Sequence, residues 1–358
     1  MKKTTVKIKI IFALAGIISA FGCSIADDML GVNEAILSDR VAPAISVIEG
    51  ISYAFVDADN TLQLQVSNPE SGYTYYWETT GGTIDGEGVT VTYTAPSVAG
   101  NTVVRCYGSK DEYVETRTAE KTIHNIEILA DNMLWLKADA ITGLNSFDAV
   151  ASWTDSGTVG NVLAQATEAN KPRYVADSLN GRPVVRFVDN TDSLFNTALT
   201  TGSGFGVAQS QITFFIVFRV NSYIAASYIL GARNGGTNSF PVLYHLAPGQ
   251  QLRFYQYSAY NASPFPVLFG QTNMLSSVCD MTQAVVADKL KIWLNGTEQV
   301  DNINVAATNP TINRLYLGSL TANNSFVGDI AEVLYFSTAL SDERRTQIEA
   351  YLTEKWGL

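Results

Sequence analysis

The stretch Phe326–Phe336, FVGDIAEVLYF, decides the fold of this chain. A strand that is apolar on both alternating faces is typical of the middle of a sheet that is covered on both sides. Two acids, Asp329 and Glu332, lie inside it three residues apart, so on a strand they face opposite sides and cannot cooperate directly. We expect each to pair with arginine or backbone groups, because an unpaired buried carboxylate is costly. The apolar residues on one parity are Val327, Ala331, Val333 and Tyr335, and those on the other are Ile330, Leu334 and Phe336.

Short runs of strand-forming residues separated by Gly, Pro and Asn fill most of the remaining chain, which is typical of an all-β protein. Before residue 125 the predicted strands are Thr61–Val66, Tyr73–Glu78, Val89–Tyr93 and Thr102–Tyr107. After residue 126 they are Leu134–Lys137, Pro183–Val188, Ser193–Phe195, Gln211–Val220, Ser227–Ala232, Phe240–His245, Gln251–Tyr257, Asn273–Asp280, Ala284–Asp288, Lys291–Leu294, Arg314–Gly318 and Val327–Phe336. About a dozen strands in this second segment require two stacked sheets.

The ends of several elements are also predicted. Asn295-Gly296 suits a type I′ hairpin turn, and Asp288-Lys289 is predicted to join Ala284–Asp288 to Lys291–Leu294. Ser341 is a natural N-cap for one amphipathic helix at the end of the chain. The apolar face of that helix, at helical spacing, is Ile348, Tyr351, Leu352 and Trp356.

The chain is acidic. Its formal charge is −11, and removal of the four lysines in residues 1–22 makes it −15. Such a charge argues against nucleic acid or an anionic lipid surface as a partner. Cys106 and Cys279 fall in different predicted domains, so we expect two buried thiols rather than a disulfide. The chain has only two histidines, His124 and His245, which weakens any catalytic or metal site based on histidine.

Residues 1–22 are predicted to be a secretory signal peptide, because a basic start precedes an apolar run, Ile10–Phe21, too short to span a bilayer. Ala20-Phe21-Gly22-Cys23 resembles a bacterial lipobox, which implies lipid attachment at Cys23 and membrane contact through that anchor alone. The protein would then sit in the bacterial cell envelope, at the outer membrane or cell surface. The alternative is an ordinary cut near Ala26 and a secreted protein. Residues 23–43 are expected to form a flexible tether.

Residues 44–125 resemble a bacterial PKD or Ig-like domain. The resemblance rests on Tyr76-Trp77, Gly81–Ile84, Tyr93–Pro96 and Ala99–Val104. It implies a β-sandwich in which Trp77 is a core residue on a central strand, and a role as a spacer. Tyr73, Tyr75 and Tyr76 could alternatively bind a ligand, although alternating aromatics in a strand are more often core and cross-strand pairs.

Residues 126–358 resemble the bacterial laminin-G-like domains of the concanavalin A-like lectin/glucanase superfamily. The resemblance rests on Leu134–Ala140, Trp153–Gly157, Ala164–Tyr174, Asn180–Phe187, Gln211–Val220, Lys291–Gly296, Gly328–Val333 and Ser341–Arg344. It implies a jelly-roll β-sandwich with a C-terminal helix. This superfamily contains lectins, hydrolases and adhesion modules, so the fold does not fix a function.

A catalytic function would require a pair of suitably spaced acidic residues in the sequence. A retaining glycosidase needs two carboxylates about 5 Å apart, and the glucanases of this superfamily carry them in a Glu-x-Asp-x-x-Glu pattern. No such pattern occurs in this chain. We therefore predict that the protein is not an enzyme.

No cofactor is required by the sequence, but calcium is a candidate. Asp139, Asp155 and Asp192, with Asn180 and Asn190, could provide oxygen ligands from loops, which suit this hard cation. The alternative is turn chemistry, which favours the same residue types.

The best candidate for ligand binding is Arg253–Tyr257. Arg253, Tyr255 and Tyr257 share one parity of the strand, so they could line an exposed face with Tyr244. Arg233, in the loop Arg233–Gly236, could border the same face. Aromatic rings can stack on sugar C–H faces and arginine can donate to hydroxyls. The alternative is that these tyrosines cover the sandwich.

The resulting hypothesis is a non-catalytic surface lipoprotein whose second domain binds glycans or protein partners. A structural or assembly component that contacts proteins is one alternative, and a polysaccharide hydrolase or lyase is another.

Overall fold

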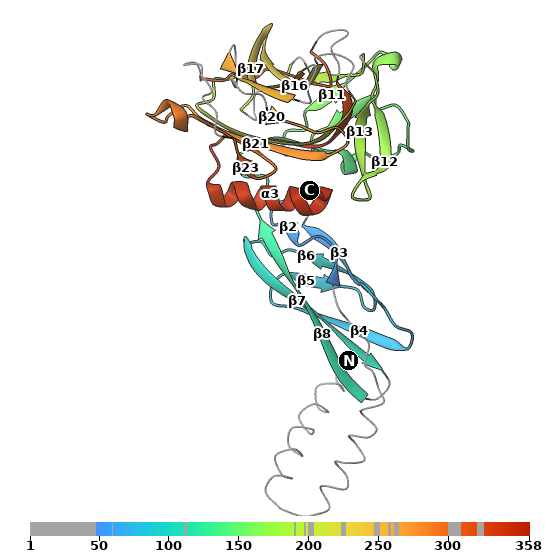
Figure 1. The fold of residues 1–358 in the computed structure, drawn as a ribbon. Coiled ribbons are helices and arrows are strands. Elements are labelled where there is room, and N and C mark those ends of the chain that lie inside the picture. Colours follow the sequence, from blue (N-terminus) through green and yellow to red (C-terminus); the bar gives the residue numbers. More distant parts are fainter. Residues whose placement is uncertain are drawn as a thin grey trace, which may run out of the picture.

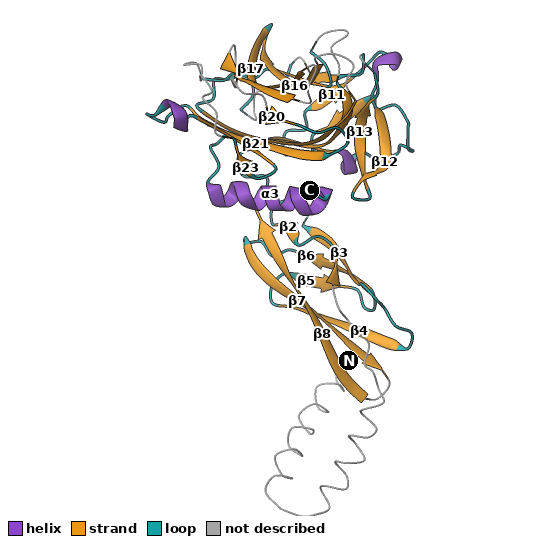
Figure 2. Cartoon of the chain, in the orientation of Figure 1, coloured by secondary structure: helices purple, strands orange, loops and turns teal. Residues whose placement is uncertain are grey.

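The computed structural model describes residues 48–358, except residues 59, 111–112, 190, 197, 200–203, 223–226, 247–250, 257–258, 261–264, 300–308 and 321–325. Cys23, the leader, the tether, Asn190 and Tyr257 therefore lie outside the described residues. Two β-sandwiches follow one another along the molecule, with one α-helix between them (Figure 1). The predicted all-β class with a C-terminal helix is confirmed (Figure 2). Within the described ranges, no helix combines the length and apolar character needed to cross a membrane.

The first sandwich contains two four-stranded sheets. One has the order β1-β3-β6-β5, and the other has the order β2-β8-β7-β4. The strands of the first sheet are β1 (Ile48–Glu49), β3 (Thr61–Val66), β6 (Thr90–Thr94) and β5 (Thr83–Asp85). Those of the second sheet are β2 (Tyr53–Phe55), β8 (Tyr113–Ile126), β7 (Gly100–Lys110) and β4 (Tyr73–Thr79).

The second sandwich contains a nine-stranded and an eight-stranded sheet. The nine-stranded sheet is formed by β10 (Ser152–Thr154), β11 (Val162–Ala164), β14 (Leu194–Asn196), β24 (Arg314–Leu317), β16 (Ser227–Asn234), β17 (Thr237–Leu246), β18 (Gln251–Gln256), β19 (Ala259–Tyr260) and β20 (Phe265–Pro266). The eight-stranded sheet is formed by β12 (Arg173–Leu179), β13 (Arg182–Phe187), β25 (Val327–Phe336), β15 (Gln211–Ser222), β21 (Thr272–Asp280), β22 (Leu290–Leu294), β23 (Thr297–Glu298) and β9 (Asn132–Lys137).

Strand β25 lies in the middle of its sheet, as its two apolar faces predict. It pairs with β15 on one side and with β13 and β9 on the other. Its inner face, including Val333 and Tyr335, packs in the core between the two sheets. Its outer face, including Leu334 and Phe336, packs in a second apolar cluster beneath the helix.

A β-bulge in β25 corrects the predicted faces of this strand. The register with β15 shifts between Glu332, opposite Val217, and Ile330, opposite Phe218, so Ala331 is an extra residue. Ile330 therefore joins the inner core and Ala331 joins the outer cluster, the reverse of the simple alternation. For the same reason the prediction that Asp329 and Glu332 face opposite sides is wrong, because both lie on the outer side of the sheet.

The helix α3 (Asp342–Trp356) covers the outer face of the eight-stranded sheet (Figure 1). The Ser341 hydroxyl accepts a hydrogen bond from the Arg344 backbone N–H, so the predicted N-cap is confirmed. Gly357 ends the helix with a positive φ of 70°. The predicted apolar face is also confirmed, since all four of its residues are buried: Ile348, Tyr351, Leu352 and Trp356.

The segment Trp153–Gly157 has a local structural role. The Asp155 carboxylate accepts hydrogen bonds from the backbone N–H groups of Trp135 at 2.8 Å and Gly157 at 2.7 Å. A Cβ atom at Gly157 would lie 2.6 Å from Asn132 Oδ1, so no larger residue fits there without rearrangement. This turn fixes the start of β9 against the rest of the sandwich.

Two further predictions are corrected. Ala284–Asp288 is not a strand, because Val286–Asp288 forms a 3₁₀ turn. Val285 and Val286 are exposed, so their side chains do not pack in the core. Trp77 lies on β4, an edge strand, where it is half-buried and its Nε1–H donates to the Gly88 carbonyl. Asn295 and Gly296 both have positive φ, which confirms the predicted type I′ turn.

Candidate functional site

The outer face of the nine-stranded sheet carries the side chains best suited to a ligand. It lies on the side of the second sandwich away from the first domain, with β16 and β17 at the top of the view (Figure 1). In β24 the buried Leu315 points into the core, so Arg314 and Tyr316 point outwards. In β16 the buried Ala232 likewise leaves Arg233 on the outer face.

Two aromatic rings are stacked on this face. Phe195 on β14 is opposite Tyr316 on β24, and their ring centroids are 5.9 Å apart with an interplanar angle of 23°. The next position in the same row is Gly231 on β16. A Cβ atom there would lie 2.3 Å from the Leu320 side chain, so Leu320 covers the glycine and extends the apolar floor.

Two guanidinium groups adjoin these rings. Arg233 on β16 is directly opposite Arg314 on β24. The Arg233 Nη2 group donates a hydrogen bond to the Gly236 carbonyl, which ties it to the end of its own hairpin. We call Phe195, Arg233, Arg314 and Tyr316 the basic aromatic face.

An asparagine pair supports the end of this face. The Asn313 side-chain oxygen accepts a hydrogen bond from the Gly235 backbone N–H at 2.8 Å. Its amide nitrogen donates to the side-chain oxygen of Asn234 at 3.0 Å. The turn between β16 and β17 is therefore held against β24, which fixes the backbone from which Arg233 projects.

The predicted ligand-binding residues fall largely on this one sheet. Arg233 belongs to the basic aromatic face, and Tyr244 on β17 is directly opposite Arg253 on β18. Tyr255 occupies the same strand two residues further on. Tyr257 lies outside the described residues.

Phe195, Arg314 and Tyr316 were not predicted as site residues. A signal was present, because Arg314-Leu-Tyr316 repeats the Arg-apolar-Tyr pattern of Arg253-Phe-Tyr255. Strand alternation puts both residues of such a pattern on one face. The position of Phe195 beside Tyr316 depends on long-range strand pairing, which no local pattern shows.

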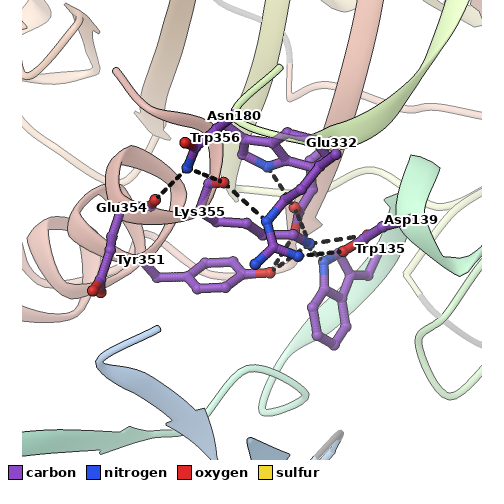
Figure 3. Close-up of polar contacts among 9 residues, drawn as sticks. Trp135, Asp139, Asn180, Glu332, Tyr351, Glu354, Lys355 and Trp356 are labelled. Carbon is purple, nitrogen blue, oxygen red and sulfur yellow. Dashed lines mark hydrogen bonds and ion pairs between the residues drawn. The ribbon is translucent and has the colours of Figure 1, made fainter. Parts of the chain in front are cut away.

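Glu332 is fully buried and accepts four hydrogen bonds beneath the helix (Figure 3). The donors are Trp135 Nε1 at 2.6 Å, Tyr351 Oη at 3.0 Å, Lys355 Nζ at 2.8 Å and Trp356 Nε1 at 2.8 Å. Burial, and then the neighbouring Glu332 carboxylate, raise the pKa of Tyr351 well above its usual range, so its hydroxyl stays a donor. Glu332 therefore fastens α3 to β25.

Lys355 links Glu332 to a second carboxylate. Its Nζ group lies 3.0 Å from Asp139 Oδ1, and Arg182 approaches the other oxygen of Asp139 at 3.7 Å (Figure 3). Two carboxylates thus share one ammonium group, which offsets one of their two negative charges, and Arg182 lies near the second at Asp139. These ion pairs give Glu332 and Asp139 a structural role in the fold.

Asp329 has two arginine partners. Its carboxylate accepts hydrogen bonds from Arg186 Nε at 2.6 Å and from Arg219 Nη2 at 2.5 Å. Both guanidinium groups also donate to the Ser178 hydroxyl. The prediction that Asp329 pairs with arginine is confirmed. The network joins β12, β13, β15 and β25 across the outer side of the sheet.

The three aspartates predicted to bind calcium are not brought together. Asp139 pairs with Lys355 and Arg182, whereas Asp155 and Asp192 accept backbone N–H groups in separate turns. Among the described residues, no three His, Cys, Asp or Glu side chains gather in a way that could hold a metal ion. The predicted ligand set therefore does not fit a calcium site.

The two sandwiches meet at a packed junction. Phe55 of β2 contacts Trp135 and Tyr351 edge-on, with ring centroids 5.1 Å and 4.9 Å apart. Ser52 donates to the Glu354 carboxylate through its backbone N–H and its hydroxyl, both at 2.9 Å. An open cavity of about 570 Å³ lies beside this contact, lined by residues of both sandwiches.

The first domain contains the other tyrosines considered as binding residues. Tyr75 is buried, whereas Tyr76 is 56% exposed and lies opposite Tyr107 in the β4–β7 register. The Tyr107 hydroxyl donates to Glu78. Cys106, next to Tyr107, is a buried thiol, as is Cys279, and burial raises the pKa of each to about 12.

No family model matches the chain, and no curated protein matches it. Among solved structures, Trypanosoma rangeli sialidase in complex with sialic acid is 10% identical, with a TM-score of 0.43 over 83% of this chain and 49% of that one. The receptor-binding domain of botulinum neurotoxin C/D mosaic serotype is 8% identical, with a TM-score of 0.43 over 61% and 51%. An arabinofuranosidase complexed with arabinofuranosyl-alpha-1,2-xylobiose is 14% identical, with a TM-score of 0.42 over 58% and 51%.

These matches are a likeness of β-sandwich architecture between chains of very different sequence. The matched region spans about half the length of each of these proteins. The prediction that the protein is not an enzyme is corrected here, because glycoside hydrolases stand among the similar structures and the fold class does not exclude hydrolysis. The laminin-G-like and PKD resemblances stay predictions.

Proposed function

We propose that the protein is a surface-anchored glycan-recognition protein, whose second domain binds carbohydrate on the basic aromatic face. The observation that carries this proposal is the stacked pair of Phe195 and Tyr316 beside Arg233 and Arg314. Partly exposed rings offer an apolar platform for sugar C–H groups, and guanidinium groups donate to oxygen atoms around it. Lectin-like sandwiches of the laminin-G type, which the sequence resembles, fit this role.

The shape of the molecule supports presentation of this face. The first sandwich precedes the second along the chain, and the nine-stranded sheet lies on the side of the second sandwich away from the first (Figure 1). A lipid on Cys23 would anchor the protein at the outer membrane or cell surface, with the first domain as a spacer. The face would then point away from the membrane.

The test is glycan binding by the chain expressed without residues 1–23, on an array of bacterial, plant and animal glycans. We expect binding by the wild type and a loss of about tenfold in affinity for Tyr316→Ala, because a stacking ring is removed. Tyr76→Ala is the matched control, since it removes an exposed tyrosine from the first domain. Measuring reducing ends released from each bound glycan separates recognition from hydrolysis.

Absence of binding to any glycan would contradict the proposal and favour a protein-binding or assembly role. Equal losses for Tyr316→Ala and Tyr76→Ala would also contradict it, because the basic aromatic face would then have no special part in recognition.

A further inference from the structure

The charge of the protein is distributed very unevenly. The chain has 34 acidic residues, yet none occurs between Ser193 and Cys279. That segment supplies β14, β16, β17, β18, β19 and β20 of the nine-stranded sheet. The remaining strands of the sheet, β10, β11 and β24, also lack acids, so no strand of this sheet contains a carboxylate side chain.

Arg233 and Arg314 contrast with Arg219 of the opposite sheet. Arg219, which belongs to the same acid-free segment, lies on the eight-stranded sheet and is paired with Asp329. Arg233 and Arg314 face each other across two strands, and among the described residues no carboxylate contacts either one. Like charges directly opposite in a sheet are unfavourable. A bound anion would relieve that repulsion.

The acids of the helix α3 are too distant to cancel this local charge. Stacked sheets lie about 10 Å apart, and the four acids of α3 lie beyond the second sheet. At physiological ionic strength the Debye length is about 8 Å, so exposed charges at that separation are largely screened. The outer face of the nine-stranded sheet is therefore locally basic on an acidic protein.

We propose that the basic aromatic face selects acidic polysaccharides, in which pyranose rings carry carboxylate or sulfate groups. This inference rests on the proposed function and names the class of glycan. A sugar ring on Tyr316 lies within reach of Arg314, because residues two apart on a strand are separated by roughly 6–7 Å. Arg233 approaches from the opposite strand, so two guanidinium groups can share one anionic group or bind successive ones.

The test uses polymers matched except for charge. Dextran sulfate is compared with dextran, and polygalacturonate with its methyl ester, using the chain expressed without residues 1–23. We expect binding to at least one anionic polymer, weakened when NaCl is raised from about 50 to about 300 mM. The double variant R233Q/R314Q should lose about tenfold or more in affinity. Lys291→Gln, which removes one exposed charge from the opposite sheet, should bind like the wild type.

The outcomes separate this inference from the proposed function. Binding to dextran or methyl-esterified polymer that R233Q/R314Q leaves unchanged would overturn the acidic class and leave glycan recognition intact. Binding to an anionic polymer that Lys291→Gln weakens as much as R233Q/R314Q would overturn the site. Binding to no polymer and no arrayed glycan would overturn both proposals. The two polymer pairs show whether the face takes sulfate or carboxylate, and thermal unfolding verifies that each variant is folded.

Discussion

Asp192 shows how burial sets the chemistry of a single residue. It is 1% exposed, and its Oδ2 atom accepts the Val188 backbone N–H at 2.7 Å. Burial is the main cause that raises the pKa of this carboxyl from an ordinary 3.8 to about 6. A raised pKa means that the folded state binds the proton more tightly than the unfolded state. The contribution of Asp192 to stability is therefore greatest below pH 4 and is lost as the pH rises to about 6.

Asp192→Asn should remove this pH dependence. We expect the free energy of unfolding of the wild type, relative to the variant, to fall by about 2–3 kcal/mol between pH 4 and pH 7. Urea unfolding at a series of pH values measures the difference. Asp85→Asn, at an exposed position in the first domain, is the control. A difference that stays constant over this pH range would show that Asp192 ionises normally in the folded protein.

At the scale of elements, strand β25 and helix α3 depend on one carboxylate. Glu332→Gln replaces the acceptor of four donors with a group that also presents N–H to them. We expect a loss of about 3 kcal/mol in the free energy of unfolding, because Lys355 loses a buried ionic partner. Urea denaturation measures this loss.

Glu298→Gln, on the exposed strand β23, is the matched control for Glu332 and should change stability little. A loss below about 1 kcal/mol for Glu332→Gln would show that the hydrogen-bond network, rather than the charge, fastens the helix.

Helices and strands were predictable from the sequence where the pattern that specifies them lies within a few neighbouring residues. Ser341 and the apolar face of α3 lie within one helix, and both were found from spacing alone. The two-sided apolar character of Val327–Phe336 correctly placed β25 at the centre of a sheet. The bulge at Ala331 was not predictable, because it reflects how β15 and β25 register against each other. That one extra residue moved Asp329 and Glu332 to the same side.

The candidate site was predictable only in part for the same physical reason. Arg253–Tyr257 was predicted from its local pattern of charge and aromatic residues, and Arg233 from its place in the loop Arg233–Gly236. Phe195 is about 120 residues from Tyr316 in sequence, and they meet only because β14 pairs with β24. The predicted calcium ligands do not form one site, because the Asp155 and Asp192 carboxylates accept hydrogen bonds from backbone N–H groups in two separate turns.

For the whole molecule, the junction between the sandwiches determines how the distal sheet is presented. Phe55→Ala removes the ring that contacts Trp135 and Tyr351, and we expect a loss of about 3 kcal/mol at the junction. The first sandwich should then unfold at a lower temperature than the second, which calorimetry would detect as a separate transition. Val98→Ala, at a position that is 72% exposed, should keep the wild-type profile. Identical profiles for all three proteins would show that the sandwiches are not energetically coupled.

The order of synthesis gives this junction a further consequence. Ser52 and Glu354 are 302 residues apart, so the first sandwich leaves the ribosome long before the helix that braces it. A product truncated before α3 would leave Glu332 with Trp135 alone among its four donors and would uncover the apolar layer beneath the helix. The fifteen-residue helix α3 is therefore the element that completes the burial of this layer and supplies three of the four donors to Glu332.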